Sequence, residues 1–165
     1  MKYAMLLGLG ALAGSSPAFA DSGNTASASG SVVVNVITPI ELTHLAGATL
    51  NFGSFTTGSG GTVVVGADNR GTTTLNVSFV PGSQVAADQF TVKGDPNRNF
   101  AIATLGGAVS NGQATISFTT APSTTAATIN PSGTAAFSVG GTLTLDGTEV
   151  AGNYTGSYSA TVTYN

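Results

Sequence analysis

The stretch "GNYTGSYSATVTYN", residues 152–165, alternates between two kinds of side chain along its whole length. Tyr, Gly, Ala and Val occupy the even positions, whereas Asn, Ser and Thr occupy the odd ones. Neighbouring side chains of a β-strand point to opposite faces, so a period of two is typical of a strand with one face in a core and the other in water. The stretch therefore predicts an amphipathic C-terminal strand.

The same period recurs upstream, between short segments rich in Gly, Pro, Ser and Asn. It is found in "TTTLNVSFV" (72–80), "QFTVKG" (89–94), "FAIATL" (100–105), "QATISFTT" (113–120) and "AAFSVGGTLTLDG" (135–147), whereas "GTVVVG" (61–66) is a short apolar run. Residues 72–80 are expected to form one half-buried strand with Leu75 on its inner face. Asn111-Gly112 predicts a tight type I′ hairpin turn, and Gly140-Gly141 predicts the tip of a second hairpin. About nine short strands separated by turn signals indicate an all-β antiparallel sandwich or barrel.

The first twenty residues, "MKYAMLLGLGALAGSSPAFA", have the three parts of a secretory signal peptide. Lys2 supplies the positive charge, an apolar run follows, and Ala18-Phe19-Ala20 is a small-residue cleavage site. The apolar run is shorter than the roughly 20 residues that a transmembrane helix needs. We expect export, cleavage before Asp21 and an extracellular or cell-surface location. Removal of 20 of the 165 residues leaves 145, enough for one domain with a core.

A second alternation, "TASASGSVVVNVITPIEL" (25–42), is too long for one domain. From Ala26 to Leu42 an extended chain would span roughly 55 Å, whereas a domain of this size has sheets of about 30 Å. Pro39 lacks an N–H and is expected to interrupt the ladder. Val32 onward is expected to be the domain's own first strand. Residues 21–31 are then either a strand lent to a neighbouring molecule or a loose leader.

Composition excludes several classes of partner. After residue 20 the only cations are Arg70, Lys93 and Arg98, and the formal charge is about −4. Such a chain cannot form the basic surface that nucleic acid or an anionic lipid surface requires. We expect no nucleic-acid partner and no membrane insertion of the mature chain. The absence of Cys is notable in an exported protein, because small secreted folds often depend on disulfides.

The sequence offers little for catalysis or for metal binding. His44 is the only histidine and is expected in a surface turn, so neither a two-histidine zinc site nor a Ser-His-Asp triad can be assembled. The closest carboxylates, Asp146 and Glu149, lack the spacing of a calcium loop and are expected at a solvated hairpin tip. We therefore predict a protein that is not an enzyme, with no catalytic residue, no metal site and no cofactor.

Four motifs resemble the bacterial family called domain of unknown function 4402: "LNFGSF" (50–55), "GGTVVV" (60–65), "FSVGGTLTL" (137–145) and the C-terminal stretch quoted first. That family in turn resembles the pilin subunits of chaperone-usher fimbriae. Such pilins end in an alternating strand with a penultimate Tyr and a Gly fourteen positions from the end, as Tyr164 and Gly152 do here. The chain departs from many of these pilins in lacking their single disulfide.

The resemblance implies an immunoglobulin-like antiparallel β-sandwich that lacks its last strand. A periplasmic chaperone would fill the gap first, before an outer-membrane usher passes the subunit on. The N-terminal extension of the next identical subunit would then replace the chaperone, a step called donor-strand complementation. The implied organisation is a signal peptide (1–20), an extension that acts as the donor strand (21–31) and a sandwich domain (32–165).

The resemblance, read together with the alternation, also implies which residues would form this contact. The donor-strand face comprises Ala26, Ala28, Gly30, Val32 and Val34, and the acceptor edge comprises Gly152, Tyr158, Ala160, Val162 and Tyr164. The expected function is that of a structural subunit of a surface filament, a pilus or fimbria, that supports adhesion or biofilm cohesion. The alternative is a self-complemented secreted adhesin or coat-type binding module, in which residues 31–38 pair within their own domain.

Overall fold

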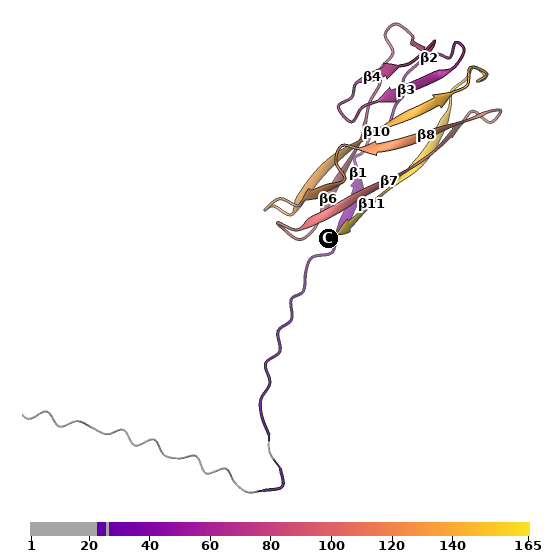
Figure 1. Ribbon diagram of the computed structural model, residues 1–165. Coiled ribbons are helices and arrows are strands. Elements are labelled where there is room, and N and C mark those ends of the chain that lie inside the picture. Colours follow the sequence, from indigo (N-terminus) through magenta and orange to yellow (C-terminus); the bar gives the residue numbers. More distant parts are fainter. Residues whose placement is uncertain (1–22, 26) are drawn as a thin grey trace, which may run out of the picture. The chain divides into compact units, whose positions relative to one another are not determined.

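The computed structural model describes residues 23–25 and 27–165 (Figure 1). The chain divides into two units between Asn35 and Val36, and the second unit, Val36–Asn165, contains all the secondary structure described below. The predicted signal peptide, Asp21 and Ala26 lie outside the described residues.

The second unit consists of strands joined by turns and loops. The strands are β1 (Glu41–His44), β2 (Phe55–Thr56), β3 (Gly61–Val65), β4 (Gly71–Thr73), β5 (Ser78–Phe79), β6 (Asp88–Lys93), β7 (Asn99–Ser110), β8 (Thr115–Pro122), β9 (Ala126–Thr128), β10 (Thr134–Leu145) and β11 (Thr155–Tyr164). The described residues contain no helix. The predicted all-β fold is confirmed.

Nine of the strands form one curled antiparallel sheet. Six of them follow one another in the order β1-β6-β10-β8-β7-β11, β3 and β9 pair with β10 and β7, respectively, and β4 pairs with β3. β10 pairs with β8 along one edge, and along the other edge it pairs first with β6 and then with β3. β7 likewise pairs with β11 on one edge and with β9 and then β8 on the other. The curl brings β1 beside β11, so the sheet folds into a sandwich-like body with β1 and β11 at its seam.

Two clusters of buried side chains fill this body. The first consists of Val63, Val77, Ile116, Phe118, Leu143 and Leu145. The second consists of Val92, Phe100, Ile102, Ile129, Phe137 and Val139. The alternation of Phe137, Val139, Leu143 and Leu145 along β10 places one strand in both clusters, as a period of two requires.

The predicted hairpin tip at Gly140-Gly141 is wrong, because both glycines lie within the continuous strand β10. A Cβ on Gly140 would collide with the carbonyl oxygen of Val65, and one on Gly141 would lie 2.7 Å from that of Thr119. The glycines therefore let β3 and β8 approach β10 closely from its two sides. A Gly pair in a strand can mark such an approach as well as a turn.

Two other local predictions need correction. Residues 72–80 are not one strand: Leu75 has φ 56° and is 85 % exposed, and the chain turns there between β4 and β5. The β7–β8 hairpin is present around Asn111-Gly112, but only Gly112 has positive φ, so the turn is not type I′. The Asn111 side chain instead accepts hydrogen bonds from the backbone N–H groups of Gln113 and Ala114.

The strand predicted from Val32 onward is also absent, since the described residues before Glu41 form no strand. Val32, Val33, Val34 and Val36 are 88, 94, 76 and 88 % exposed. A β-branched strand gains its stability from packing and ladder hydrogen bonds, and the single chain supplies neither to these residues. The ordered sheet begins at Glu41, after Pro39.

We expect the Gly140→Ala substitution to destabilise the domain by about 1–3 kcal/mol or more, because the new methyl group overpacks against backbone that cannot move away easily. Thr144→Ala, at an exposed position of the same strand, should change the free energy of unfolding by less than about 0.5 kcal/mol. Urea denaturation followed by circular dichroism measures both. Equal effects would mean that the close approach at Gly140 is not a structural requirement.

Candidate functional site

One edge of β11 has no partner strand in the described part of the chain. β11 pairs with β7 from Thr155↔Ser110 to Tyr164↔Phe100, with an irregularity between Ser157 and Ser159. Its inward side chains are only partly buried, whereas Phe100 and Ile102 on the paired strand β7 are 0 % and 4 % exposed. The core next to β11 is therefore incompletely covered.

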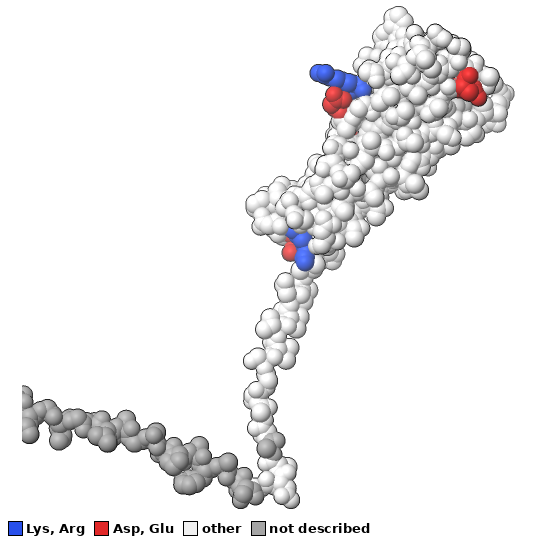
Figure 2. Space-filling view, viewed as in Figure 1, with Lys and Arg blue, Asp and Glu red and all other residues white. Residues whose placement is uncertain are grey.

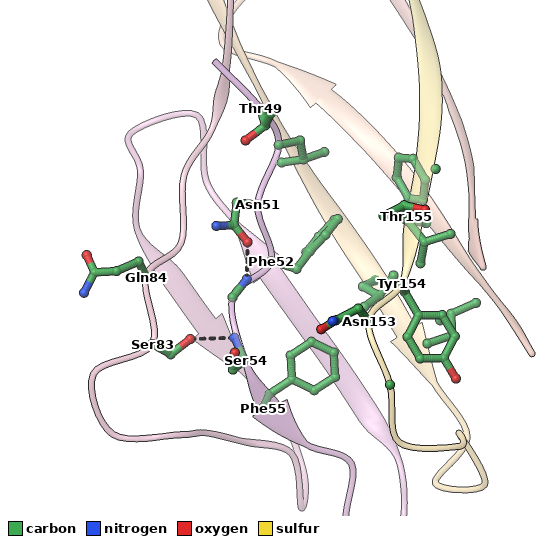
Figure 3. A pocket seen from close by; sticks show the side chains of 18 of the residues that line it. Thr49, Asn51, Phe52, Ser54, Phe55, Ser83, Gln84, Asn153, Tyr154 and Thr155 are labelled. Atoms are coloured by element: carbon green, nitrogen blue, oxygen red, sulfur yellow. Dashed lines mark hydrogen bonds between the residues drawn. The ribbon is translucent and has the colours of Figure 1, made fainter. Parts of the chain in front are cut away.

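A groove of about 1370 Å³ runs beside this edge. Residues 48–58 form one wall, and residues 149–158 with Ala160 form the other. The apolar side chains that line the groove include Leu50, Phe52, Ile116, Phe118 and Leu143. Figure 3 shows the rings of Phe52 and Phe55 pointing toward the wall that carries Asn153, Tyr154 and Thr155.

Hydrogen bonds hold the first wall in place. The Asn51 side chain accepts a bond of 2.8 Å from the Gly53 N–H, and the Asn51 backbone pairs with that of Ala86. The Ser83 hydroxyl accepts a bond of 2.7 Å from the Ser54 N–H. These bonds tie residues 51–54 to residues 83–86, so the wall stands apart from β11 (Figure 3).

A polar cluster lines part of the groove, and we call its members His44, Asp88 and Tyr158 the polar fork. His44 Nε2 lies 2.6 Å from Asp88 Oδ1, and Tyr158 Oη donates to Asp88 Oδ2 at 2.8 Å. Asp88 is 4 % exposed and is the one charged side chain that is buried among the described residues. A buried carboxylate is costly unless it is hydrogen-bonded, and these two bonds meet that need. They also link the end of β1 and the start of β6 to β11.

The Tyr158 ring is fixed on several sides. It makes edge-to-face contacts with Phe90 and Phe118, with centroids 6.2 and 6.4 Å away, and it packs against both core clusters. Burial, and then the hydrogen bond and negative charge of Asp88, raise the pKa of the Tyr158 hydroxyl above its usual value. The phenol therefore stays neutral and remains a donor.

Beyond Tyr158, toward the C-terminal end of β11, the seam between β1 and β11 is closed. Tyr164 Oη donates a bond of 2.8 Å to the Thr38 carbonyl and accepts one of 2.7 Å from the Asp95 N–H. The Arg98 guanidinium lies 5.2 Å from the centre of the Tyr164 ring, within the range of a cation–π contact. The chain thus enters the domain beside the last residues of β11, whereas the groove lies along its first half.

A family model with the description "Domain of unknown function (DUF4402)" matches residues 40–164, which is more than half of the chain. The chain belongs to this family. The comparisons with curated proteins and with solved structures gave no match. The matched residues nearly coincide with the compact unit. The exposed residues Val32, Val33, Val34 and Val36 therefore lie outside the DUF4402 domain.

The predicted acceptor edge of the DUF4402 domain divides into two parts. Gly152, Tyr158 and Ala160 line the groove, whereas Val162 and Tyr164 belong to the closed seam, where they pack on the second core cluster. On the predicted donor-strand face, Ala28, Gly30, Val32 and Val34 are exposed and form no strand in the single chain.

Sequence reasoning missed the polar fork. His44 ends β1 and does not occupy a surface turn, and Asp88 opens β6. The only available signal was a carboxylate at the start of the apolar run "DQFTVKG". The pairing of His44 with Phe90, two residues from Asp88, brings the two side chains together, and alternation alone does not give that register.

The carboxylates of Asp146 and Glu149 stabilise a turn. Glu149 accepts bonds from the backbone N–H groups of Asp146 and Gly147, and Thr148 donates to Asp146, which lowers the pKa of that carboxyl. The described residues hold no group of three or more side chains of the kinds that bind metals. They also include no helix with the length and apolar character of a membrane span.

We expect the free energy of unfolding of the DUF4402 domain to fall as the pH rises above about 10, the usual pKa of tyrosine. Tyr158 keeps its proton in the folded state, because its pKa is raised there, but loses it in the unfolded chain. Tyr158→Phe removes this effect and should show a shallower fall in urea denaturation at alkaline pH. Tyr154→Phe, which removes a hydroxyl bound to the Val150 carbonyl, is the matched control and should keep the wild-type fall. Equal slopes for the Tyr158→Phe variant and the wild type would contradict the assignment.

Proposed function

We propose that this chain is a structural subunit of an exported surface filament, in which each subunit completes the sandwich of its neighbour with an inserted strand. The observation that carries the proposal is the unpaired edge of β11 beside an apolar groove. An extended segment that enters there gains main-chain hydrogen bonds along the edge and places alternate side chains in the core.

The exposed N-terminal segment has the chemistry of such a strand. Val32, Val34 and Val36 are on one face in an extended chain, and each is at least three-quarters exposed in the single chain. Residues 23–40 contain no charged side chain, and charged groups are also sparse on the face of the domain drawn in Figure 2. Burying one Val side chain is worth about 1.5–3 kcal/mol, so these valines favour a partner.

The positions of the two surfaces on the domain favour a linear polymer. The chain enters the domain beside Tyr164, through the Thr38 contact, whereas the groove lies along the first half of β11. The surface that lends a strand and the surface that receives it are therefore different. Contacts between unlike surfaces propagate into rings or filaments and do not close as two-fold dimers.

The resemblance to chaperone-usher pilins agrees with this assignment. It rests on the alternating C-terminal strand, on penultimate Tyr164 and on Gly152. Before assembly an exposed edge and groove are an aggregation hazard, which explains a need for a periplasmic chaperone and an outer-membrane usher. Export through the signal peptide places the polymer at the cell surface, where it serves adhesion or biofilm cohesion.

We expect Val34→Asp to reduce filaments at least about tenfold, because insertion would bury an unpaired carboxylate. Asn35→Asp adds the same charge to the opposite, outward face and should leave assembly close to wild type. Negative-stain electron microscopy of the producing cells and SDS-resistant ladders that collapse on boiling measure the polymer. Abundant filaments from the Val34→Asp variant would refute strand insertion, and a stable wild-type monomer without ladders would favour a self-complemented binding module.

A further inference from the structure

We propose that the polar fork is the closed end of the groove and sets how far the neighbour's strand can enter. This inference rests on the proposed function and concerns residues 30–36 of a second copy as the occupant. It assigns a positioning role to Asp88, the one charged side chain that is buried among the described residues, in addition to its link between β1, β6 and β11.

The first argument is the contrast between the two halves of the seam. Above Tyr158, residues 48–58 stand apart from β11 and leave the groove. From Tyr158 downward, Asp88 joins β11 to His44, and Tyr164 joins it to Thr38. β1 also contacts β11. A strand that advanced past the fork would have to displace β1 and leave the Asp88 carboxylate without its partners.

The second argument is one of length. The compact unit of a second copy begins at Val36, and Gly152, three residues before β11 begins, lines the groove on the β11 side. An inserted strand antiparallel to β11 with Val36 opposite Gly152 has Val34 opposite Tyr154 and reaches Tyr158 with Gly30. Seven residues span about 23 Å at 3.3 Å each, so the segment 30–36 covers the wall from Gly152 to the fork.

The third argument is chemical complementarity along that register. The three valines of the inward face meet the apolar side chains that line the groove, among them Leu50 and Phe52. The last inserted residue, Gly30, meets the Tyr158 ring, which is held by Phe90 and Phe118. Because both Asp88 oxygens already accept hydrogen bonds within the domain, the uncharged strand needs no counter-charge there.

Disulfide trapping tests the register, and the chain has no cysteine of its own. Full-length secreted subunits carry Ser31→Cys together with either Ser157→Cys or Ser159→Cys, all at exposed positions. In the proposed register Ser31 is opposite Ser157, whereas an entry deeper by two residues places it opposite Ser159. With an intact fork we expect the Ser157 pair to cross-link about tenfold more than the Ser159 pair, the ratio expected from the loss of one buried hydrogen bond.

Changes at the fork should then relax this preference. We expect Asp88→Ala to reduce the ratio to about threefold or less, a loss of about half or more of the one-bond discrimination. Asp88→Asn keeps an acceptor for Tyr158 and a donor for His44 and should retain the wild-type ratio. Tyr158→Phe, which preserves the ring, provides an independent variant should Asp88→Ala fail to fold. Non-reducing gels of the isolated polymer give the ratio.

The outcomes separate the two proposals. Intermolecular cross-links with a ratio that Asp88→Ala and Tyr158→Phe leave unchanged would overturn the role of the fork but support strand insertion. Disulfides only within single subunits, or none at all, would overturn strand insertion between copies and the fork with it. A dominant Ser159 cross-link in the wild-type polymer would also overturn the fork as the closed end.

Discussion

The backbone N–H and C=O groups on the outer edge of β11 are the constraint on which the rest of the domain depends. Every other long strand of the sheet has neighbours on both edges over part of its length, but β11 pairs only with β7. Such an edge must be covered, blocked or used. The domain blocks the C-terminal half of this edge with β1, Tyr158 and Tyr164. The N-terminal half of the edge lies next to a groove.

The closed half of the seam relies on hydrogen bonds made by the side chains of Tyr158 and Tyr164, and the open half relies on apolar surface. Asp88 stands at the boundary between the two, and Tyr158 contacts both core clusters. β10 connects the same two clusters on the other side of the sandwich, where Gly140 and Gly141 let its neighbours approach. β10 thus contributes buried side chains to both core clusters, whereas β11, with its incomplete edge, covers them only in part.

The sequence predicted the fold class and most strands, because period-two alternation reports directly on half-buried strands. The prediction failed where one sequence pattern can have two physical causes. Gly140-Gly141 lets neighbouring strands approach β10 and does not form a turn. Leu75 fits the alternation of a strand but lies exposed in a turn. For the site, alternation singled out Tyr158, and the resemblance to pilins singled out Gly152; both line the groove. Alternation was unable to find His44 and Asp88, which meet only through the register of β1 on β6.

The entry of the chain beside Tyr164 also determines how a polymer of this kind would carry tension. A pull along the filament would act on Thr38 at one end of a subunit and on the strand inserted along β11 at the other. The ladder between that strand and β11 would then be loaded lengthwise, with its hydrogen bonds in shear, and would not peel open bond by bond. Resistance to force is a matter of unfolding rate, so such a joint can hold mechanically even where each bond contributes little at equilibrium.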